Sequence, residues 1–336
     1  MNTIADFNSM SNNLNLIKFV ASLLVIFSHA HTMIGNQEDI LFSLSKQTIT
    51  LGGLAVVIFL FASGYFVTKS LLTKNNLRLY FKTRFLRIYP LFIVVIILTA
   101  FVLGPIVTFL TPGEYFSNLG TYKYFSYLIC IPNYSLPGVF TNNTLTTVNG
   151  SLWTLILEII LYIALAVMYK LGLLCKEKMK YVNILFVIAI IALFVVEPAF
   201  TKPYAAYLRP AFAFAMGVNY YIYRDQIKLD YRVLLLAIVL GIPMFILNRI
   251  SLFFVVCFPY ILSMVIFSKH QVGELFGKLG NYSYAIYLVA FPIQQMLIHF
   301  IPSIGVLRNT LYSCILSIII GVILYYAVEK PMAKIK

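Results

Sequence analysis

The sequence predicts an all-α integral membrane protein, with about ten transmembrane helices in one bundle and both termini in the cytoplasm. Of its 336 residues, 61% are hydrophobic and only 11% are charged, whereas about a quarter of the residues in soluble proteins are charged. The apolar residues form continuous runs near the roughly 20 residues that a helix needs to cross a bilayer, unlike the alternating segments of a β-barrel. These runs predict spans at 14–34, 51–69, 86–110, 151–172, 181–197, 205–223, 233–248, 251–267, 279–300 and 310–329.

The positions of the basic residues predict the orientation of these spans. With the N-terminus inside, 19 of the 25 Lys and Arg residues fall on the inner side. Only six fall outside: Lys46, Lys123, Lys202, Arg209, Arg249 and Arg308. The positive-inside rule therefore places both termini in the cytoplasm. Most of the net charge of +14 is explained in this way, and no basic patch remains for nucleic acid.

The chain is predicted to have one membrane domain, 14–336, preceded by a short cytoplasmic tail, 1–13. The longest segment on the outer side, 111–150, is rich in Asn, Thr, Gly, Pro and Tyr, which is typical of irregular structure. A loop of this length is more often functional than not. The four cysteines are scattered without a C-x-x-C pair and are interpreted as packing residues, so no metal site is expected.

The first span carries two ionisable residues, Lys18 and His29, eleven positions apart. Three helical turns separate them, so they share a face about 16 Å apart along the axis. An ionisable side chain inside the bilayer costs a few kcal/mol and is a functional hypothesis by default. The alternatives are a lysine that extends to the interface and a histidine hydrogen-bonded within the bundle.

A second basic pair, Arg84 and Arg87, lies at the inner start of the third predicted span. Their spacing of three residues places both on one helical face. Positive-inside topology alone accounts for arginines at this boundary. The functional alternative is a site for a phosphorylated cytoplasmic ligand, because guanidinium groups bind phosphates in a bidentate manner.

The fourth span opens with SLWTLILE, which carries Trp153 and Glu158. Trp153 is as typical of an aromatic belt at the membrane interface as of a functional site. Glu158 and His29 lie at similar predicted depths, and a carboxylate behind a histidine would prepare the ring for general-base catalysis. Burial of the pair without chemistry is the alternative. For Ser63 helix packing is the better explanation, and the spacing of Tyr284 and Tyr287 assigns them no chemistry.

Taken together, these segments resemble the acyltransferase family 3 membrane proteins, bacterial enzymes that O-acylate sugars of envelope and exported polysaccharides. The resemblance covers essentially the whole chain. It rests on a basic residue separated by ten residues from a histidine, a phenylalanine-rich stretch with Ser-Gly, an R-x-x-R pair, S-L-W-x-L-x-x-E, S-Y-x-x-Y-L and a terminal E-x-P. Two departures stand out, because the family's usual arginine is Lys18 here and a frequent late histidine is replaced by Ala290.

The resemblance implies a multi-pass O-acetyltransferase of the bacterial cytoplasmic (inner) membrane. Cytoplasmic acetyl-CoA would be the donor and co-substrate, bound near Lys18, Arg84 and Arg87. His29, backed by Glu158, would activate a hydroxyl of a polysaccharide or of its lipid-linked precursor. Ser63, Trp153, Tyr284 and Tyr287 would shape the site, and membrane lipids would surround the protein.

Three alternatives remain from the sequence. The enzyme could transfer another acyl group such as succinyl. A glycan transporter or flippase would also need many spans and intramembrane charge, but it leaves the combined motifs unexplained. A non-enzymatic membrane subunit is the third, and in it His29→Ala would be silent.

Overall fold

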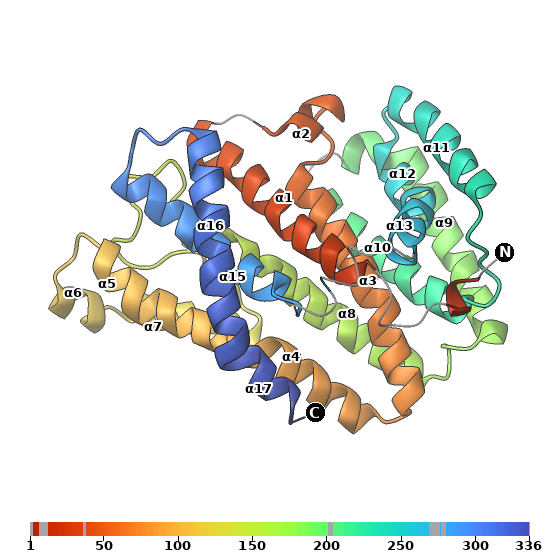
Figure 1. The fold of residues 1–336 in the computed structure, drawn as a ribbon, viewed down its shortest axis with the longest axis horizontal. Helices are drawn as coiled ribbons and strands as arrows, with labels where there is room; N and C mark the ends of the chain where they lie inside the picture. Colours follow the sequence, from red (N-terminus) through yellow and green to blue (C-terminus); the bar gives the residue numbers. More distant parts are fainter. Residues whose placement is uncertain are drawn as a thin grey trace. The chain divides into compact units, whose positions relative to one another are not determined.

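The computed structural model describes residues 3–6, 13–35, 38–200, 204–268, 276 and 280–335. Helices make up nearly all the regular structure of these residues, and the only β pairing among them is an isolated bridge between Thr3 and Lys228 (Figure 1). Five described helices are long and apolar enough to cross a membrane: Leu14–Gly35, Leu51–Lys74, Leu77–Val107, Gly150–Lys170 and Val306–Ala333. The all-α membrane class is therefore confirmed, whereas the number of ten spans stays a prediction.

The chain divides into two compact units, each built from three separate stretches. Unit 1 comprises 1–21, 40–77 and 157–280, and unit 2 comprises 22–39, 78–156 and 281–336. The division falls inside α1 (Leu14–Gly35) and α8 (Trp153–Lys170) and just after the first residue of α4 (Leu77–Leu98). Most of the predicted tail, 1–13, lies outside the described residues.

Unit 1 is organised around the contact between α3 and α10. Gly64 of α3 lies against the backbone of Phe214, and Gly217 of α10 lies against the backbone of Phe61. Glycines permit such an approach because a Cβ at either position would collide with the facing carbonyl oxygen. The helices that lie wholly within unit 1 are α2 (Ile40–Leu44), α3 (Leu51–Lys74), α9 (Lys176–Phe200), α10 (Tyr204–Ile222), α11 (Tyr231–Ile246), α12 (Ile250–Val256) and α13 (Phe258–Ile266).

One predicted span of unit 1 is wrong in form, because 251–267 is two helices rather than one. The break falls at Cys257, and Pro259 lies in the first turn of α13. Proline has no N–H to donate to the preceding turn, so it favours the start of a helix and interrupts a continuous one.

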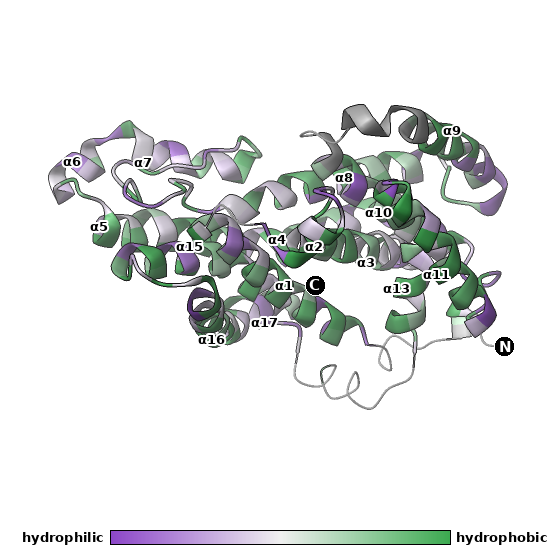
Figure 2. Cartoon of the chain, turned by 90° about the horizontal axis from the view of Figure 1, so that it is seen from above, coloured by the Kyte–Doolittle hydropathy of each residue, from purple (hydrophilic) through white to green (hydrophobic). Residues whose placement is uncertain are grey.

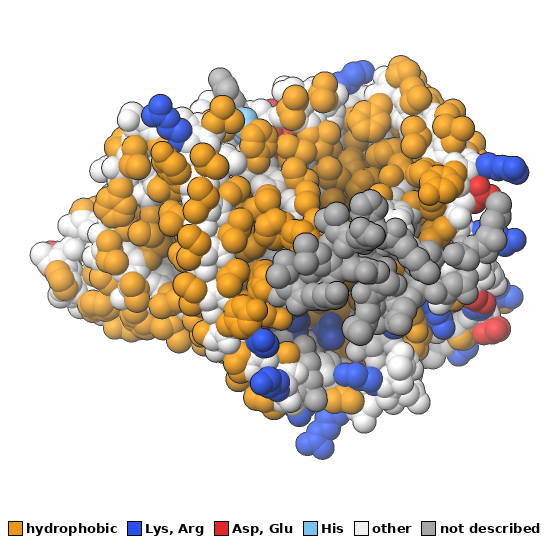
Figure 3. Space-filling view, viewed as in Figure 1, with side chains coloured by type: hydrophobic (Ala, Val, Ile, Leu, Met, Phe, Trp, Pro, Cys, Tyr) orange, Lys and Arg blue, Asp and Glu red, His pale blue; other side chains and the backbone are white. Residues whose placement is uncertain are grey.

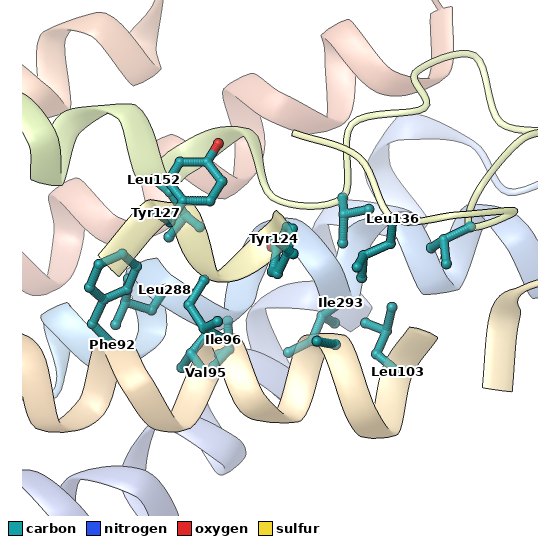
Figure 4. Close-up of a cluster of buried hydrophobic side chains, with 14 of the residues drawn as sticks. Phe92, Val95, Ile96, Leu103, Tyr124, Tyr127, Leu136, Leu152, Leu288 and Ile293 are labelled. Atoms are coloured by element: carbon teal, nitrogen blue, oxygen red, sulfur yellow. The ribbon is translucent and has the colours of Figure 1, made fainter. Parts of the chain in front are cut away.

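Unit 2 packs around a cluster of buried side chains (Figure 4). Phe92 and Ile96 from α4, Leu288 from α15, and Tyr124 and Tyr127 from the segment 111–150 meet in it. The helices of unit 2 are α4 (Leu77–Leu98), the π turn Thr99–Leu103, α5 (Gly104–Val107), α6 (Pro112–Ser117), α7 (Leu119–Lys123), the 3-10 turns Tyr124–Ile129 and Gly150–Leu152, α15 (Ser283–Phe300), α16 (Val306–Leu324), the π turn Tyr325–Glu329 and α17 (Lys330–Ala333).

Two sequence expectations change in this unit. The helix that carries the third predicted span, 86–110, begins earlier than that span, because α4 starts at Leu77 and places Arg84 in its second turn. The segment 111–150 is not wholly irregular, since Thr111 caps α6 through a capping box with Glu114. Short helices there bring tyrosines into the core of unit 2.

The outward faces of the long helices are apolar. On α16, Leu311, Ile315, Ile319 and Ile323 recur every fourth residue and are all exposed. Figure 3 shows hydrophobic side chains covering this face, with Lys and Arg gathered beyond the C-terminal end of α16. A continuous exposed apolar face of this kind is typical of contact with lipid.

Candidate functional site

His29 lies in the part of α1 that belongs to unit 2 and packs against α15. The imidazole meets the ring of Phe291 edge-on, with ring centroids 5.1 Å apart and planes at 72°. Its Nδ1 atom is buried and has no hydrogen-bond partner among the described residues. A buried polar atom without a partner is uncommon in a protein and costs free energy. The alternative of a histidine hydrogen-bonded within the bundle is therefore not supported at this nitrogen.

Two contacts from α15 hold this section of α1. The fully buried Gln294 donates through Nε2 to the carbonyl of Ile26 at 2.8 Å and to Asn309 Oδ1 at 3.2 Å. Phe291 is confined on its other side, because a Cβ at Gly150 would lie 2.6 Å from its ring. The glycine before SLW is therefore needed for the ring that touches His29.

An acidic residue that the sequence analysis did not single out lies near the same helix. Asp39 is 1% exposed and accepts a hydrogen bond from the hydroxyl of Ser28, the residue before His29. The only signal in the sequence was an acid in a short link between two apolar runs. Its bond to Ser28 closes the link after α1 back onto the helix.

The segment that precedes α8 is tied to α15 through polar contacts. Asn149 donates to the carbonyl of Leu288 at 2.9 Å. The hydroxyl of Tyr287 donates to the carbonyl of Ser151 at 2.9 Å and lies 2.7 Å from the Thr154 hydroxyl. Tyr287 thus orients the SLW segment, while Trp153 is the first residue of α8 and is half-buried.

Three predicted elements converge at Arg87 of α4. Its guanidinium forms an ion pair with Glu329, whose side chain is only 4% exposed. It also lies 5.3 Å from the centroid of the Tyr284 ring, and the Tyr284 hydroxyl donates to the carbonyl of Ile88 at 2.9 Å. Arg84 lies one turn earlier and is half-buried. The R-x-x-R, S-Y and E-x-P motifs therefore form one cluster.

Unit 1 holds Glu158 in a triangle of oxygens. Ser63 Oγ donates to Glu158 Oε1 at 2.9 Å and lies 2.9 Å from the hydroxyl of Tyr162, and that hydroxyl also donates to Oε1. Both bonds fall on the same carboxylate oxygen, so Oε2 is left for a further donor.

Tyr162 was missed by the sequence analysis. The available signal was its spacing of four residues from Glu158, which places both side chains on one face of α8. Ser63, considered for packing or for shaping the site, directly contacts the carboxylate. Packing is the role of its neighbour Gly64.

The structure thus groups the predicted residues by unit. His29, Arg84, Arg87, Trp153, Tyr284 and Tyr287 belong to unit 2, and Lys18, Ser63 and Glu158 belong to unit 1. The pairing of His29 with Glu158 stays a prediction. In the described part of the chain, no three His, Cys, Asp or Glu side chains group as metal ligands would.

These features define a class, that of helical membrane proteins with a histidine and a hydrogen-bonded carboxylate embedded among apolar helices. The family described as "Acyltransferase domain", acyltransferase family 3, matches residues 11–328. The chain belongs to this family and is an O-acyltransferase.

A relative supports this assignment over almost the full length. A protein named O-acetyl transferase from Shigella phage Sf6 is 26% identical over 331 residues, which is 95% of each chain. No solved structure matches the chain.

Proposed function

We propose that this protein transfers an acetyl group from cytoplasmic acetyl-CoA to a hydroxyl of an envelope or exported polysaccharide, or of its lipid-linked precursor. It does so as a multi-pass protein of the bacterial cytoplasmic membrane, with ten spans and both termini inside. The observation that carries the proposal is the unpartnered, buried Nδ1 of His29 on an apolar helix. The name of the phage relative supports acetyl as the group transferred.

Glu158 is the proposed partner of His29. The carboxylate is anchored through Oε1 by Ser63 and Tyr162, which leaves Oε2 to accept a hydrogen bond from an imidazole Nδ1–H. That bond would fix the tautomer and leave Nε2 as the base. His29 Nδ1 and Glu158 Oε2 are thus each available for a hydrogen bond to a residue of the other unit.

The chemistry follows from these roles. Nε2 of His29 accepts the proton of the sugar hydroxyl as its oxygen forms a bond to the thioester carbonyl carbon. The carbon–sulfur bond then breaks, and the departing thiolate takes up the proton, which yields an acetyl ester and free coenzyme A. If the imidazole first carries the acetyl group, the overall balance is the same.

The donor would bind at the cluster around Arg87. Glu329 and Tyr284 orient the guanidinium, and Arg84 presents a second one a turn away. Two guanidinium groups suit the phosphates of coenzyme A, because each can donate a pair of parallel hydrogen bonds. Lys18 would add a cation on the helix that bears His29, and the segment 111–150 would present the glycan.

The first test is the O-acetyl content of surface polysaccharide, measured by proton NMR in a strain that lacks the gene. Wild type should restore the acetyl esters, and a stably expressed His29→Ala protein should not. His31→Ala is the matched control, because His31 lies two residues away and contacts the carbonyl of Phe27 instead. Equal acetylation by the His29 and His31 variants would refute the proposed base.

The second test addresses the donor with radiolabelled acetyl-CoA and inverted membrane vesicles. Glu329→Gln should raise the KM for acetyl-CoA about tenfold with a smaller change in kcat, because it releases Arg87 from its orienting partner. Arg308→Gln, an exposed arginine on α16, is the control. A lower kcat at an unchanged KM for acetyl-CoA would show that the cluster around Arg87 does not bind the donor.

A further inference from the structure

Unit 1 contains a cavity of about 530 Å³ between α9, α10 and α12. Its wall is almost entirely apolar and includes Val187 of α9 and Val256 of α12. Both valines are also exposed at the surface, at 52% and 45%. The cavity therefore opens through an apolar surface.

The outward face of α9 continues this apolar surface. Ile184, Leu185 and Ile188 each expose more than half of their side chains. Figure 2 shows that the described part of α9 is hydrophilic at its start and mainly hydrophobic beyond it. An apolar opening beside an exposed apolar helix face fits contact with hydrocarbon rather than with water.

Two asparagines interrupt the apolar wall. Asn183 Oδ1 and Asn219 Oδ1 are buried and have no hydrogen-bond partner among the described residues. The amide nitrogen of Asn219 is already used, since it donates to the carbonyl of Ala215 at 3.1 Å. An occupant that satisfies these oxygens needs hydrogen-bond donors next to a hydrocarbon chain.

The same end of the cavity is bordered by positive charge. Helix α9 begins Lys176, Glu177, Lys178, Met179, Lys180, and Lys180 shares a face with Asn183 and Val187 through spacings of three and four residues. Tyr223, which lines the cavity, donates to the backbone carbonyl of Lys176 at 3.3 Å. A residue of the cavity wall thus contacts the first turn of α9, which carries these lysines.

These lysines differ in exposure, and Glu177 places one negative charge among them. Lys176 forms an ion pair with Asp225, whereas Lys178 and Lys180 are exposed. Lys180 lies over the ring of Tyr181. Phosphate esters are the anions that such lysines bind at a membrane surface.

We propose that this cavity is a binding site for one acidic phospholipid of the phosphatidylglycerol type. A hydrocarbon chain fills the apolar part, the phosphate meets Lys178 and Lys180, and the glycerol hydroxyls donate to Asn183 and Asn219. A phosphatidylcholine has no hydroxyl donors and no net negative charge. None of the residues that line this cavity is among those assigned to acetyl transfer.

The test is native mass spectrometry of the full-length protein in detergent, titrated in turn with phosphatidylglycerol and phosphatidylcholine of the same chains. Wild type should bind one phosphatidylglycerol at least tenfold more tightly than phosphatidylcholine. A Lys178→Gln, Lys180→Gln double variant should lose that preference, and Asn183→Leu should weaken phosphatidylglycerol binding. Lys123→Gln, an exposed lysine of α7, is the matched control.

Three outcomes would overturn the proposal. Equal affinity for the two lipids would show that the headgroup makes no specific contact. Unchanged phosphatidylglycerol binding in the double variant would show that Lys178 and Lys180 do not bind the phosphate. Displacement of the bound lipid by coenzyme A would assign the cavity to the acyl donor instead. If Asn183→Leu fails to fold, the surface lysine variants still decide the question.

Discussion

Substitution of Gly64 by alanine should separate α3 from α10 and disturb the carboxylate triangle. A Cβ at residue 64 would lie 2.1 Å from the carbonyl oxygen of Phe214. An ordinary contact needs about 3.4 Å, so the two helices must move apart by about 1.3 Å at this point. No side chain can rotate away, because the facing atom belongs to the backbone.

The size of the effect follows from that displacement. Forcing an extra methyl into a close-packed contact costs about 1–3 kcal/mol. This corresponds to about a 5- to 150-fold change in the unfolding equilibrium. Ser63 precedes Gly64 on α3, so its bond to Glu158 should lengthen as the helix shifts, and acetyl transfer should fall as well.

The assay is unfolding of the purified protein with increasing mole fraction of SDS in mixed micelles, alongside acetyl transfer in vesicles. Gly64→Ala should unfold at a lower SDS fraction than wild type. Gly113→Ala is the matched control, because a Cβ there meets nothing within 4 Å. If the two alanine variants unfold at the same SDS fraction, the reasoning on the α3–α10 contact is wrong.

Three further predictions concern single contacts. Tyr162→Phe removes one donor from Glu158 and should lower kcat about tenfold at nearly unchanged acetyl-CoA KM, while an unchanged kcat would show that Ser63 suffices. Gly150→Ala should displace Phe291 and reduce acetylation in the NMR assay, and full acetylation would show that this ring does not position His29. The pKa of Glu114 is held below its usual range by hydrogen bonds from Thr111. The capping box therefore stabilises α6 fully above the ordinary carboxyl pKa, and this stabilisation is lost as the pH falls through the lowered pKa. The amide protection of residues 112–117 should decrease over that pH range in wild type and not in Glu114→Gln.

Much of the local fold was readable from the sequence. The helices that begin at Leu14 and Leu51 start where the apolar runs predicted, because hydrophobic length is a strong signal in membrane helices. Helix α4 begins nine residues before the predicted span, since its first turns are basic and carry no continuous apolar signal. The break at Cys257 was missed because its apolar flanks read as one continuous run.

The candidate site was predictable only in part. Arg87 and Glu329 were each singled out in separate motifs, but their contact spans 242 residues and no local pattern encodes it. Gln294 likewise reaches α1 from a distant helix. Tyr162 was missed because a tyrosine among apolar residues has no distinct signature until its hydroxyl is seen on Glu158.

The interleaved arrangement of the two units has a consequence for how the chain is made. The bond from Gln294 to Ile26 joins residues 268 positions apart. At a synthesis rate of about 5–20 residues per second, α1 waits roughly 15–50 s in the membrane before α15 emerges. A ribosome that stalls before residue 281 leaves unit 2 without its third stretch. The nascent protein would then display His29 without Phe291 beside it, and quality-control proteases would meet a half-built unit rather than a folded domain.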